Sequence, residues 1–437
     1  MILILCAIWF SFLYYFGYKN LGDNDSFGPV KLFTSKMIIM NIPYIYFIAI
    51  YPEKFPAEIL NVLNMNLEDA FIYYSIVQTI LYLTVLLGIS IGKKKKITKF
   101  PKNSFISLKV CHFIIIISFF LGLYDYYKFL NGVGGLAYLL SNLSSRTELL
   151  NEGEGLGNAI FYLTISLILG FYSYFKLKSN LKLFILILLT IFSILIISST
   201  GGRKNVLYLI IFIAGAYNYY NKPFKFRNID KRYLIVGFIF ITFYILFMPI
   251  LRGKDGFENL VNGNISLVEL LKIEDLVTAI SYTYIDVFSS NYFNFNNYWY
   301  FNSTLDIFEN FKSIPKYLKP PIDDGVYFRS IVKYNINFSP PTARGNMYES
   351  SWPIEHLGFS YANLGLIGII VFSLILGYLF QLTYSYLLKN NYSPIFLYLY
   401  IFVIFNFNFS NLRLVQILSL LPILLFYMFI IKIIKGK

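Results

Sequence analysis

The sequence is poor in the side chains that build disulfide frameworks and metal sites. Its 437 residues include two cysteines and two histidines, and charged residues make up only 14%. Cys6 and Cys111 both lie in apolar runs, so neither a disulfide framework nor a cysteine metal site is indicated. His112 and His356 have no clustered ligands near them, and we therefore expect neither a metal nor a cofactor. The sequence also lacks the glycine patterns of P-loop and Rossmann nucleotide sites.

Apolar residues dominate the composition instead. They make up 57% of the chain, and the mean hydropathy is +0.60. These values are far from those of soluble domains and predict an all-α polytopic membrane protein. Eleven apolar runs are long enough to cross a bilayer as helices. They are Ile2–Tyr18, Val30–Tyr51, Ala70–Ile91, Leu108–Tyr124, Leu156–Phe175, Leu183–Ser199, Val206–Tyr220, Tyr233–Leu251, Leu357–Tyr384, Pro394–Phe409 and Leu414–Ile434.

Two N-terminal runs need separate interpretation. Ile2–Tyr18 has no basic segment before it and no cleavage site, so we expect a retained span rather than a signal peptide. Val30–Tyr51 has a short apolar core that carries Asn41 and Pro43 and follows Lys36. If this run only lies in the membrane interface, the chain has ten spans and its N-terminus is inside.

Lysine-rich gaps fall at every second connection between the runs. The clusters Lys93–Lys102, Lys176–Lys182 and Lys222–Arg232 agree with the basic C-terminal tail. With eleven spans, the positive-inside rule places the N-terminus outside and the C-terminus inside. The net charge of +14 is then a basic inner rim attracted by anionic lipid, and no sign of nucleic-acid binding.

This topology divides the chain into three regions. Residues 1–251 hold helices 1 to 8 with short loops, and residues 357–437 hold helices 9 to 11. Residues 252–356, between helices 8 and 9, form one large extracytoplasmic loop, which we expect to be a small, partly helical cap. The inner loops are too short for a nucleotide-binding domain, so any active site is expected at the outer face.

Arginine is distributed against the insertion rule. Six of the eight arginines fall in the outward gaps, and their guanidinium groups match phosphate oxygens bidentately. Gly201 and Gly202 permit a tight turn before a helix that begins near Asn205, and Arg203 with Lys204 completes an anion cradle. Snorkelling cations on a solvated turn are the simpler reading. The other candidate ligands of a diphosphate are Arg252, Arg344 and Arg413, with Arg146 as a secondary candidate; each is equally open to a structural ion pair.

A proton acceptor is available close to the ninth run. Glu355 and His356 precede it directly, and Glu349 lies a few residues earlier. His356 titrates near neutral pH and could be a general base for a sugar hydroxyl, and a desolvated carboxylate could do the same. A histidine that anchors a helix start among lipid headgroups is the alternative.

One short pattern suggests metal instead. Asp23-Asn24-Asp25 is a DxD, which holds a divalent metal in some glycosyltransferases. The eleven-span topology places it inside, away from the arginines.

The arrangement resembles a family of membrane enzymes. Thr200–Lys204 opens a span, a long outer loop follows, and Glu355 precedes Tyr361–Gly365 at the start of a span with Gly368 and Gly377. These features are similar to the Wzy-type oligosaccharide repeat unit polymerases of bacterial surface polysaccharide synthesis. The resemblance covers the arrangement of nearly the whole chain, with short and degenerate motifs.

The resemblance implies an activity and its partners. It implies polymerisation of undecaprenyl-pyrophosphate-linked repeat units into O-antigen or capsule at the outer face of the bacterial cytoplasmic membrane. Donor and acceptor are both lipid-linked, and a chain-length regulator is a candidate partner. We expect a metal-independent, inverting displacement at the anomeric carbon, with the arginines neutralising the pyrophosphate that leaves.

Three other functions fit parts of the sequence. A flippase or transporter for the same lipid would show internal repeats, broken helices and charges within spans, and the sequence shows no repeat and few such charges. An O-antigen ligase would use similar chemistry but deliver the glycan to a lipid A core. A metal-dependent polyprenyl-phosphosugar glycosyltransferase would use Asp23 and Asp25.

Overall fold

The computed structural model describes residues 1–22, 25–93, 108–143, 155–199, 203–221, 244, 262, 277–278 and 281–435. Every regular element in these ranges is a helix. Seven helical segments are long and apolar enough to cross a membrane: α1 (Ile2–Phe16, continued by a π turn to Leu21), α2 (Pro29–Ile50), α4 (Leu67–Lys93), α5 (Leu108–Gly132), α8 (Leu156–Leu177), α9 (Asn180–Ser199) and α18 (His356–Lys389). The predicted class, a helical membrane protein, is confirmed.

The remaining α-helices are shorter or less apolar. They are α3 (Ala57–Leu63), α6 (Leu136–Ser141), α10 (Arg203–Tyr220), α15 (Thr283–Tyr292), α16 (Asn302–Glu309), α17 (Gly325–Tyr334), α19 (Pro394–Asn406) and α20 (Asn411–Lys435). Ten of the eleven predicted apolar runs thus coincide with helices. The other run, Tyr233–Leu251, lies outside the described residues apart from Tyr244, so the number of spans stays a prediction.

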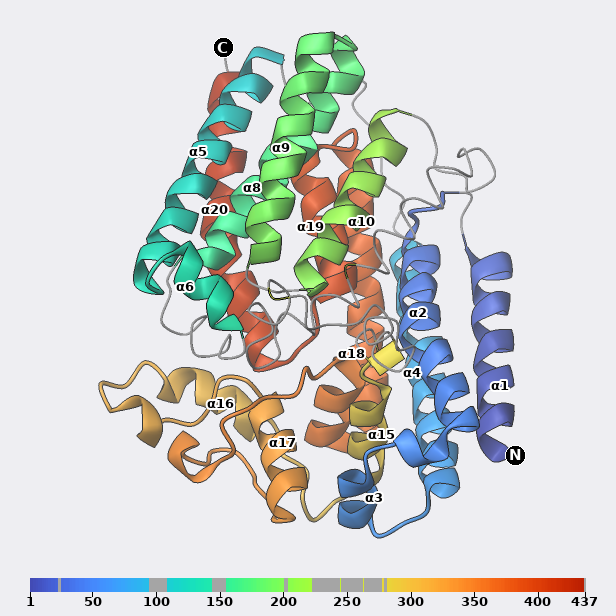
Figure 1. The fold of residues 1–437 in the computed structure, drawn as a ribbon. Helices are drawn as coiled ribbons and strands as arrows, with labels where there is room; N and C mark the ends of the chain where they lie inside the picture. The colour runs from blue at the N-terminus through green and yellow to red at the C-terminus, as the bar shows by residue number, and fades with distance from the viewer. Residues whose placement is uncertain are drawn as a thin grey trace.

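The long helices stand side by side in one bundle (Figure 1). The helices α1, α2 and α4 form one flank, α5, α8, α9 and α20 form the other, and α10, α18 and α19 lie between them. The two termini lie at opposite ends of the bundle, as an odd number of spans requires. α16 and α17 lie across the end that holds the N-terminus, and we call them the cap.

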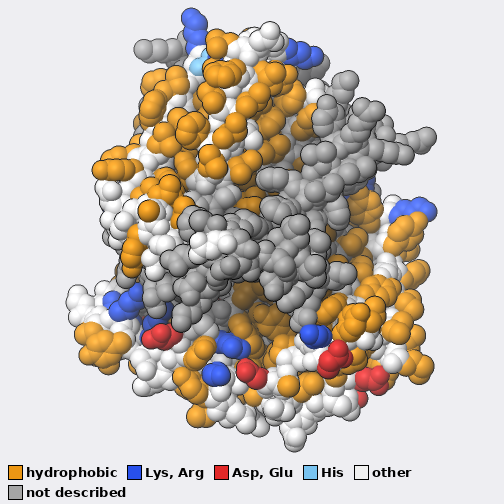
Figure 2. All heavy atoms as spheres, viewed as in Figure 1, with side chains coloured by type: hydrophobic (Ala, Val, Ile, Leu, Met, Phe, Trp, Pro, Cys, Tyr) orange, Lys and Arg blue, Asp and Glu red, His pale blue; other side chains and the backbone are white. Residues whose placement is uncertain are grey.

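Charge is distributed unequally between these two ends. On the face seen in Figure 2, lysine and arginine stand at the end that holds the C-terminus, whereas both signs of charge occur around the cap. Hydrophobic side chains cover much of the surface between them. This is the pattern that the positive-inside rule produces when the cap faces outward.

Glycines bring α4 and α18 into backbone contact. A Cβ atom placed on Gly88 would lie 2.2 Å from the carbonyl oxygen of Leu374, and one on Gly377 would lie 2.1 Å from that of Val85. No larger residue fits at either position unless the helices separate. Small residues at membrane helix contacts have this effect, because apolar lipid leaves close packing as a main source of association.

The predicted ninth span is broken near its start. Leu364 and Gly365 have non-helical backbone angles, and Gly365 has φ +57°. His356 Nε2 lies 3.0 Å from Ser373 Oγ, although seventeen residues of straight helix would separate them by roughly 25 Å. Residues 356–363 therefore fold back along the segment after Gly365. His356 thus lies beside the part of α18 that follows Gly365, and Glu355 directly precedes it in the chain.

The loop before the cap forms hydrogen bonds to this turn. Trp299 N donates to Ala362 O at 2.9 Å and Tyr300 N to Asn363 O at 3.2 Å. The Asn363 side chain accepts from Phe301 N at 2.9 Å. These bonds satisfy backbone groups that the break in the helix leaves exposed.

The expected outer loop is not confined to the cap. Its helix α15 packs against α2, α4 and α18 within the bundle. Residues 285–290 of α15 are all buried, including Asp286. A short helix enclosed on all sides shows no single apolar face, which is why the sequence does not mark it as part of the bundle.

Candidate functional site

A buried ion pair joins the first part of the chain to the last part. Lys36 of α2 lies 3.2 Å from Glu355, and the two side chains are only 12% and 13% exposed. Glu355 stands at the N-cap of α18, where the positive end of the helix dipole favours a carboxylate. Ionisable groups at such depth are expensive to bury and usually mark a functional site in membrane proteins.

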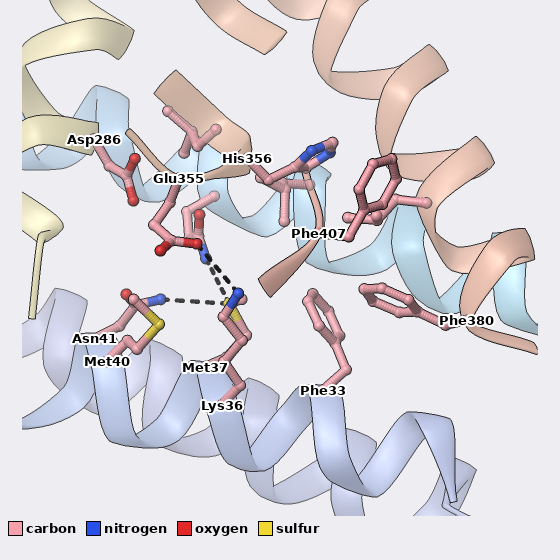
Figure 3. Close-up of a pocket in the computed structure, with 14 residues that line it drawn as sticks. Phe33, Lys36, Met37, Met40, Asn41, Asp286, Glu355, His356, Phe380 and Phe407 are labelled. Carbon is pink, nitrogen blue, oxygen red and sulfur yellow. Dashed lines mark hydrogen bonds and ion pairs between the residues drawn. The ribbon is translucent and has the colours of Figure 1, made fainter. Parts of the chain in front are cut away.

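A second carboxylate faces this pair. Asp286 comes from α15 and is 9% exposed. Figure 3 shows its carboxylate and that of Glu355 directed into the same cavity, with the Lys36 amine below them. The backbone N–H of Gly358 lies beside the Asp286 carboxylate, and Asp286 Oδ1 has no partner among the described residues. One amine thus faces two carboxylates, so the site attracts a proton or a further positive group.

Amide and hydroxyl groups line one side of this site. Asn41 Nδ2 donates to Tyr14 Oη at 2.9 Å, and Gln78 Nε2 donates to the same oxygen at 3.3 Å. Thr283 Oγ1 donates to Asn41 Oδ1 at 3.3 Å. Since these residues come from α1, α2, α4 and α15, the network fixes four helices around the charges.

The cavity at these residues is small and partly open. Its volume is about 30 Å³, which is room for one or two water molecules. Asn41, Gln78 and the charged residues form its polar part, and Phe33, Phe380 and Phe407 form the apolar part. A sugar ring does not fit in this geometry, whereas a single hydroxyl group does.

Of the predicted bases, Glu355 faces the cavity more directly than His356. The His356 imidazole points away from the Glu355 carboxylate (Figure 3). Its Nε2 atom meets Ser373, and its ring lies against Phe409 with centroids 6.1 Å apart. His356 Nδ1 has no partner in the part of the chain that the structure describes. Glu349 is exposed and does not line the cavity.

The predicted anion cradle is described only in part. α10 begins at Arg203, close to the predicted helix start near Asn205. The side chains of Arg203 and Lys204 lie outside the described atoms, and Gly201 and Gly202 lie outside the described residues. Arg146 and Arg252 lie outside them as well.

Contacts of α10 nevertheless locate the start of that helix. Tyr208 Oη, five residues after Arg203, donates to Phe405 O at 2.7 Å. Glu355 and Arg413 both lie close enough to act electrostatically on the Tyr208 hydroxyl. The first turns of α10 therefore approach both the buried carboxylate and the start of α20.

The two remaining predicted arginines both lie near Asp323, beside the cap. Arg413 is in the first turn of α20, where its Nη1 donates to Gln416 Oε1 at 2.7 Å. Arg413 and Arg344 both act on the carboxylate of Asp323, although burial is the larger effect and raises the pKa of that carboxyl. Neither arginine lines the small cavity at Glu355.

The DxD pattern lies elsewhere. Asp25 Oδ2 accepts from Tyr219 Oη at 2.8 Å and Tyr384 Oη at 2.9 Å, and its Oδ1 accepts from Phe27 N at 2.9 Å. These donors tie together α10, α18 and the start of α2 and occupy the carboxylate. Asp23 lies outside the described residues. Within the described ranges, no group of three or more histidine, cysteine or acidic residues is placed to hold a metal.

Sequence reasoning missed Lys36 and Asp286 as site residues. Lys36 lies within the Val30–Tyr51 run, where an ionisable residue is itself a functional signal. It resembled an inner flanking cation because the apolar core starts at Met37. Asp286 offered no such signal, because nothing in the sequence places its segment inside the bundle.

Comparison of the chain with protein-family profiles, curated proteins and solved structures finds no match. The function therefore has to be argued from the site itself.

Proposed function

We propose that this protein joins lipid-linked oligosaccharide repeats into a surface polysaccharide of O-antigen or capsule type. The substrates are an undecaprenyl-pyrophosphate-linked donor and acceptor within the bilayer of a bacterial cytoplasmic membrane. The observation that carries the proposal is the buried Lys36–Glu355 pair at the N-cap of α18. The pair supplies a desolvated carboxylate near the start of α10, the helix that carries Arg203 and Lys204. Glu355 and Arg413 both act electrostatically on Tyr208 of that helix.

In this proposal Glu355 is the general base. Its carboxylate takes the proton from an acceptor hydroxyl, the only part of a sugar that the cavity admits. The hydroxyl oxygen then forms a bond to the anomeric carbon of the donor, and the bond from that carbon to pyrophosphate breaks. Lys36 pairs with the Glu355 carboxylate at 3.2 Å and holds it in place before the substrate binds.

The leaving pyrophosphate carries the negative charge that develops. Arg203, Lys204, Arg252, Arg344 and Arg413 are the proposed groups that neutralise it at the outer face. The distribution of charge in Figure 2 supports this orientation, since the cap end carries both signs and the opposite end carries lysine and arginine. Eleven spans with an outer cap between helices 8 and 9 complete the proposed topology.

Reconstituted protein tests the proposal directly. With two lipid-linked repeats and no nucleotide sugar, the wild-type chain is expected to make longer lipid-linked glycans. Glu355→Gln removes the base and keeps the shape, so turnover is expected to fall by about a hundredfold or more. Glu309→Gln is the matched control, because Glu309 belongs to an ion pair with Lys312 in the cap and is far more exposed. Unchanged turnover in Glu355→Gln would exclude Glu355 as the base.

A transporter or flippase of the same lipid is the second candidate. The broken helix α18 favours it, and so do the ionisable residues Lys36, Glu355 and Asp286 inside the bundle. Broken helices and buried charges are typical of transporters. A strain that lacks the protein separates the two. Loss of polymerisation leaves single repeats on the outer leaflet, whereas loss of a flippase leaves them on the inner leaflet.

A further inference from the structure

A second group of buried polar residues lies where the cap meets the bundle. Ser303 and Asp306 come from α16, Asp324 immediately precedes α17, and Asn411 begins α20. All four are at most 1% exposed. Figure 1 shows α16 and α17 below the bundle, and α16 is in contact with α20.

Asp324 is the centre of this group. Its Oδ2 accepts from Asn411 N at 2.9 Å and its Oδ1 from Asn411 Nδ2 at 3.2 Å. The same Asn411 amide makes a short contact with the carbonyl oxygen of Ser303. The Ser303 hydroxyl lies beside the Asp324 carboxylate without the geometry of a hydrogen bond. Ser303 and Asp306 are three residues apart on α16 and so share one face of that helix.

Three oxygen atoms of this group are unsatisfied. Ser303 Oγ, Asp306 Oδ1 and Asn411 Oδ1 are buried and have no hydrogen-bond partner among the described residues. The second carboxylate oxygen of Asp306, Oδ2, does have a partner and accepts from Tyr327 Oη at 2.8 Å. Buried polar atoms without partners are rare in folded proteins, and each one needs a specific cause.

The carboxylates of this group also lack a counter-ion. Within the described ranges, no lysine or arginine forms an ion pair with Asp306 or Asp324. The group therefore combines two carboxyl side chains that form no ion pair among the described residues with three buried oxygen atoms that have no partner there.

We propose that Ser303, Asp306, Asp324 and Asn411 bind one calcium ion that ties the cap to α20. Carboxylate, amide and hydroxyl oxygens are the ligands that Ca²⁺ accepts, and water completes its six to eight positions. Two carboxylates balance the charge of a divalent cation. Zinc would require nitrogen or sulfur ligands, and Mg²⁺ demands a stricter octahedron with several waters. This inference does not depend on the proposed catalytic function.

The position of the ion gives it a role in the architecture. Its ligands come from α16, from the start of α17 and from the first residue of α20, and Arg413 follows two residues later. Bound calcium thus fixes the cap relative to the turn that carries Arg413. Removal of the ion is expected to loosen the cap without unfolding the bundle.

Terbium luminescence tests the proposal, because Tb³⁺ replaces Ca²⁺ and emits when nearby aromatic rings absorb light. Tyr327 is bonded to Asp306, and the Trp299 ring lies 5.4 Å from that of Tyr327. Chelator-treated protein in detergent is expected to bind one equivalent of Tb³⁺ with sensitised emission. Ca²⁺ is expected to displace it, and an equal concentration of Mg²⁺ is expected to displace far less.

Variants identify the site. Asp306→Asn keeps the acceptor for Tyr327 but removes the charge, so Tb³⁺ affinity is expected to fall at least tenfold. Ser303→Ala, a milder change, is expected to weaken it several-fold. Glu53→Gln is the control, because Glu53 is exposed in the turn after α2, and it is expected to leave the affinity unchanged. Calcium is also expected to raise the unfolding temperature of wild type but not of Asp306→Asn. An undiminished signal in Asp306→Asn, equal displacement by Mg²⁺, or no calcium effect on wild type would overturn the proposal.

Discussion

Replacing Lys36 by methionine tests whether the buried ion pair organises the bundle. The change keeps an unbranched apolar side chain of nearly the same length and removes the charged amine. In the wild-type protein the amine lies 3.2 Å from Glu355, and both side chains are almost enclosed. At an effective dielectric constant of about 20, two unit charges at that distance attract with about 5 kcal/mol. After the substitution, the Glu355 carboxylate remains buried beside Asp286 without its cation.

The expected loss of stability is about 3–5 kcal/mol, the usual consequence of removing one partner of a buried pair. Replacing both partners, as in Lys36→Met with Glu355→Gln, leaves no uncompensated charge. The double variant is therefore expected to lose less stability than the sum of the two single variants. The coupling between the positions should be about 1–3 kcal/mol.

Unfolding by a denaturing detergent, followed by circular dichroism, gives the free energies of all four proteins. Lys54→Met is the control for loss of a lysine, since Lys54 is exposed in the turn after α2. A loss below about 1 kcal/mol in Lys36→Met, together with additive effects in the double variant, would refute the argument that this pair supports the bundle.

Three further changes probe the packing around the site. Gly377→Ala is expected to destabilise by about 1–3 kcal/mol, measured by the same titration, because its Cβ would lie 2.1 Å from Val85 O; wild-type stability would show that α4 and α18 can separate freely. Gly365→Ala should cost about 1–3 kcal/mol, since φ is +57° and the new Cβ would lie 2.1 Å from Tyr298 Oη and 2.6 Å from its Cζ; in a Tyr298→Ala background, which removes the ring, only the contact should be relieved, and a cost of zero there would show that the backbone is unstrained. Asp25→Asn is expected to lower stability while leaving the metal requirement of activity unchanged, and a new metal dependence would revive the DxD hypothesis.

The candidate site was predictable only in part. Glu355 and His356 stood out because they precede an apolar run, and a helix N-terminus is a place where charged groups are stabilised. The sequence could not separate their roles, since these adjacent side chains leave the helix in different directions. The structure turns Glu355 toward Lys36 and His356 toward Ser373. Arg203 was predictable as a candidate because it lies in an outward gap between apolar runs. That position can be identified without knowledge of any tertiary contact.

The break in α18 shows a similar limit. Gly365 is one of several glycines in an apolar run, and the run by itself predicts a continuous span. The reversal depends on contacts made by Trp299 and Tyr300, more than sixty residues earlier in the chain. Those contacts supply partners for backbone groups that a broken helix exposes, and without them a continuous helix would be favoured.

The sequence by itself determined that this is a helical membrane protein, and it located ten of the helices. The reason is that the length of an apolar run is a local property to which the bilayer responds directly. Only the tertiary structure decided which charges meet. Lys36 and Glu355 are separated by 319 positions in the sequence, and they meet because α2 packs against α18. The same holds at the cap, where Asp324 meets Asn411 across 87 positions. Such pairings depend on the packing of whole helices, which no local pattern encodes.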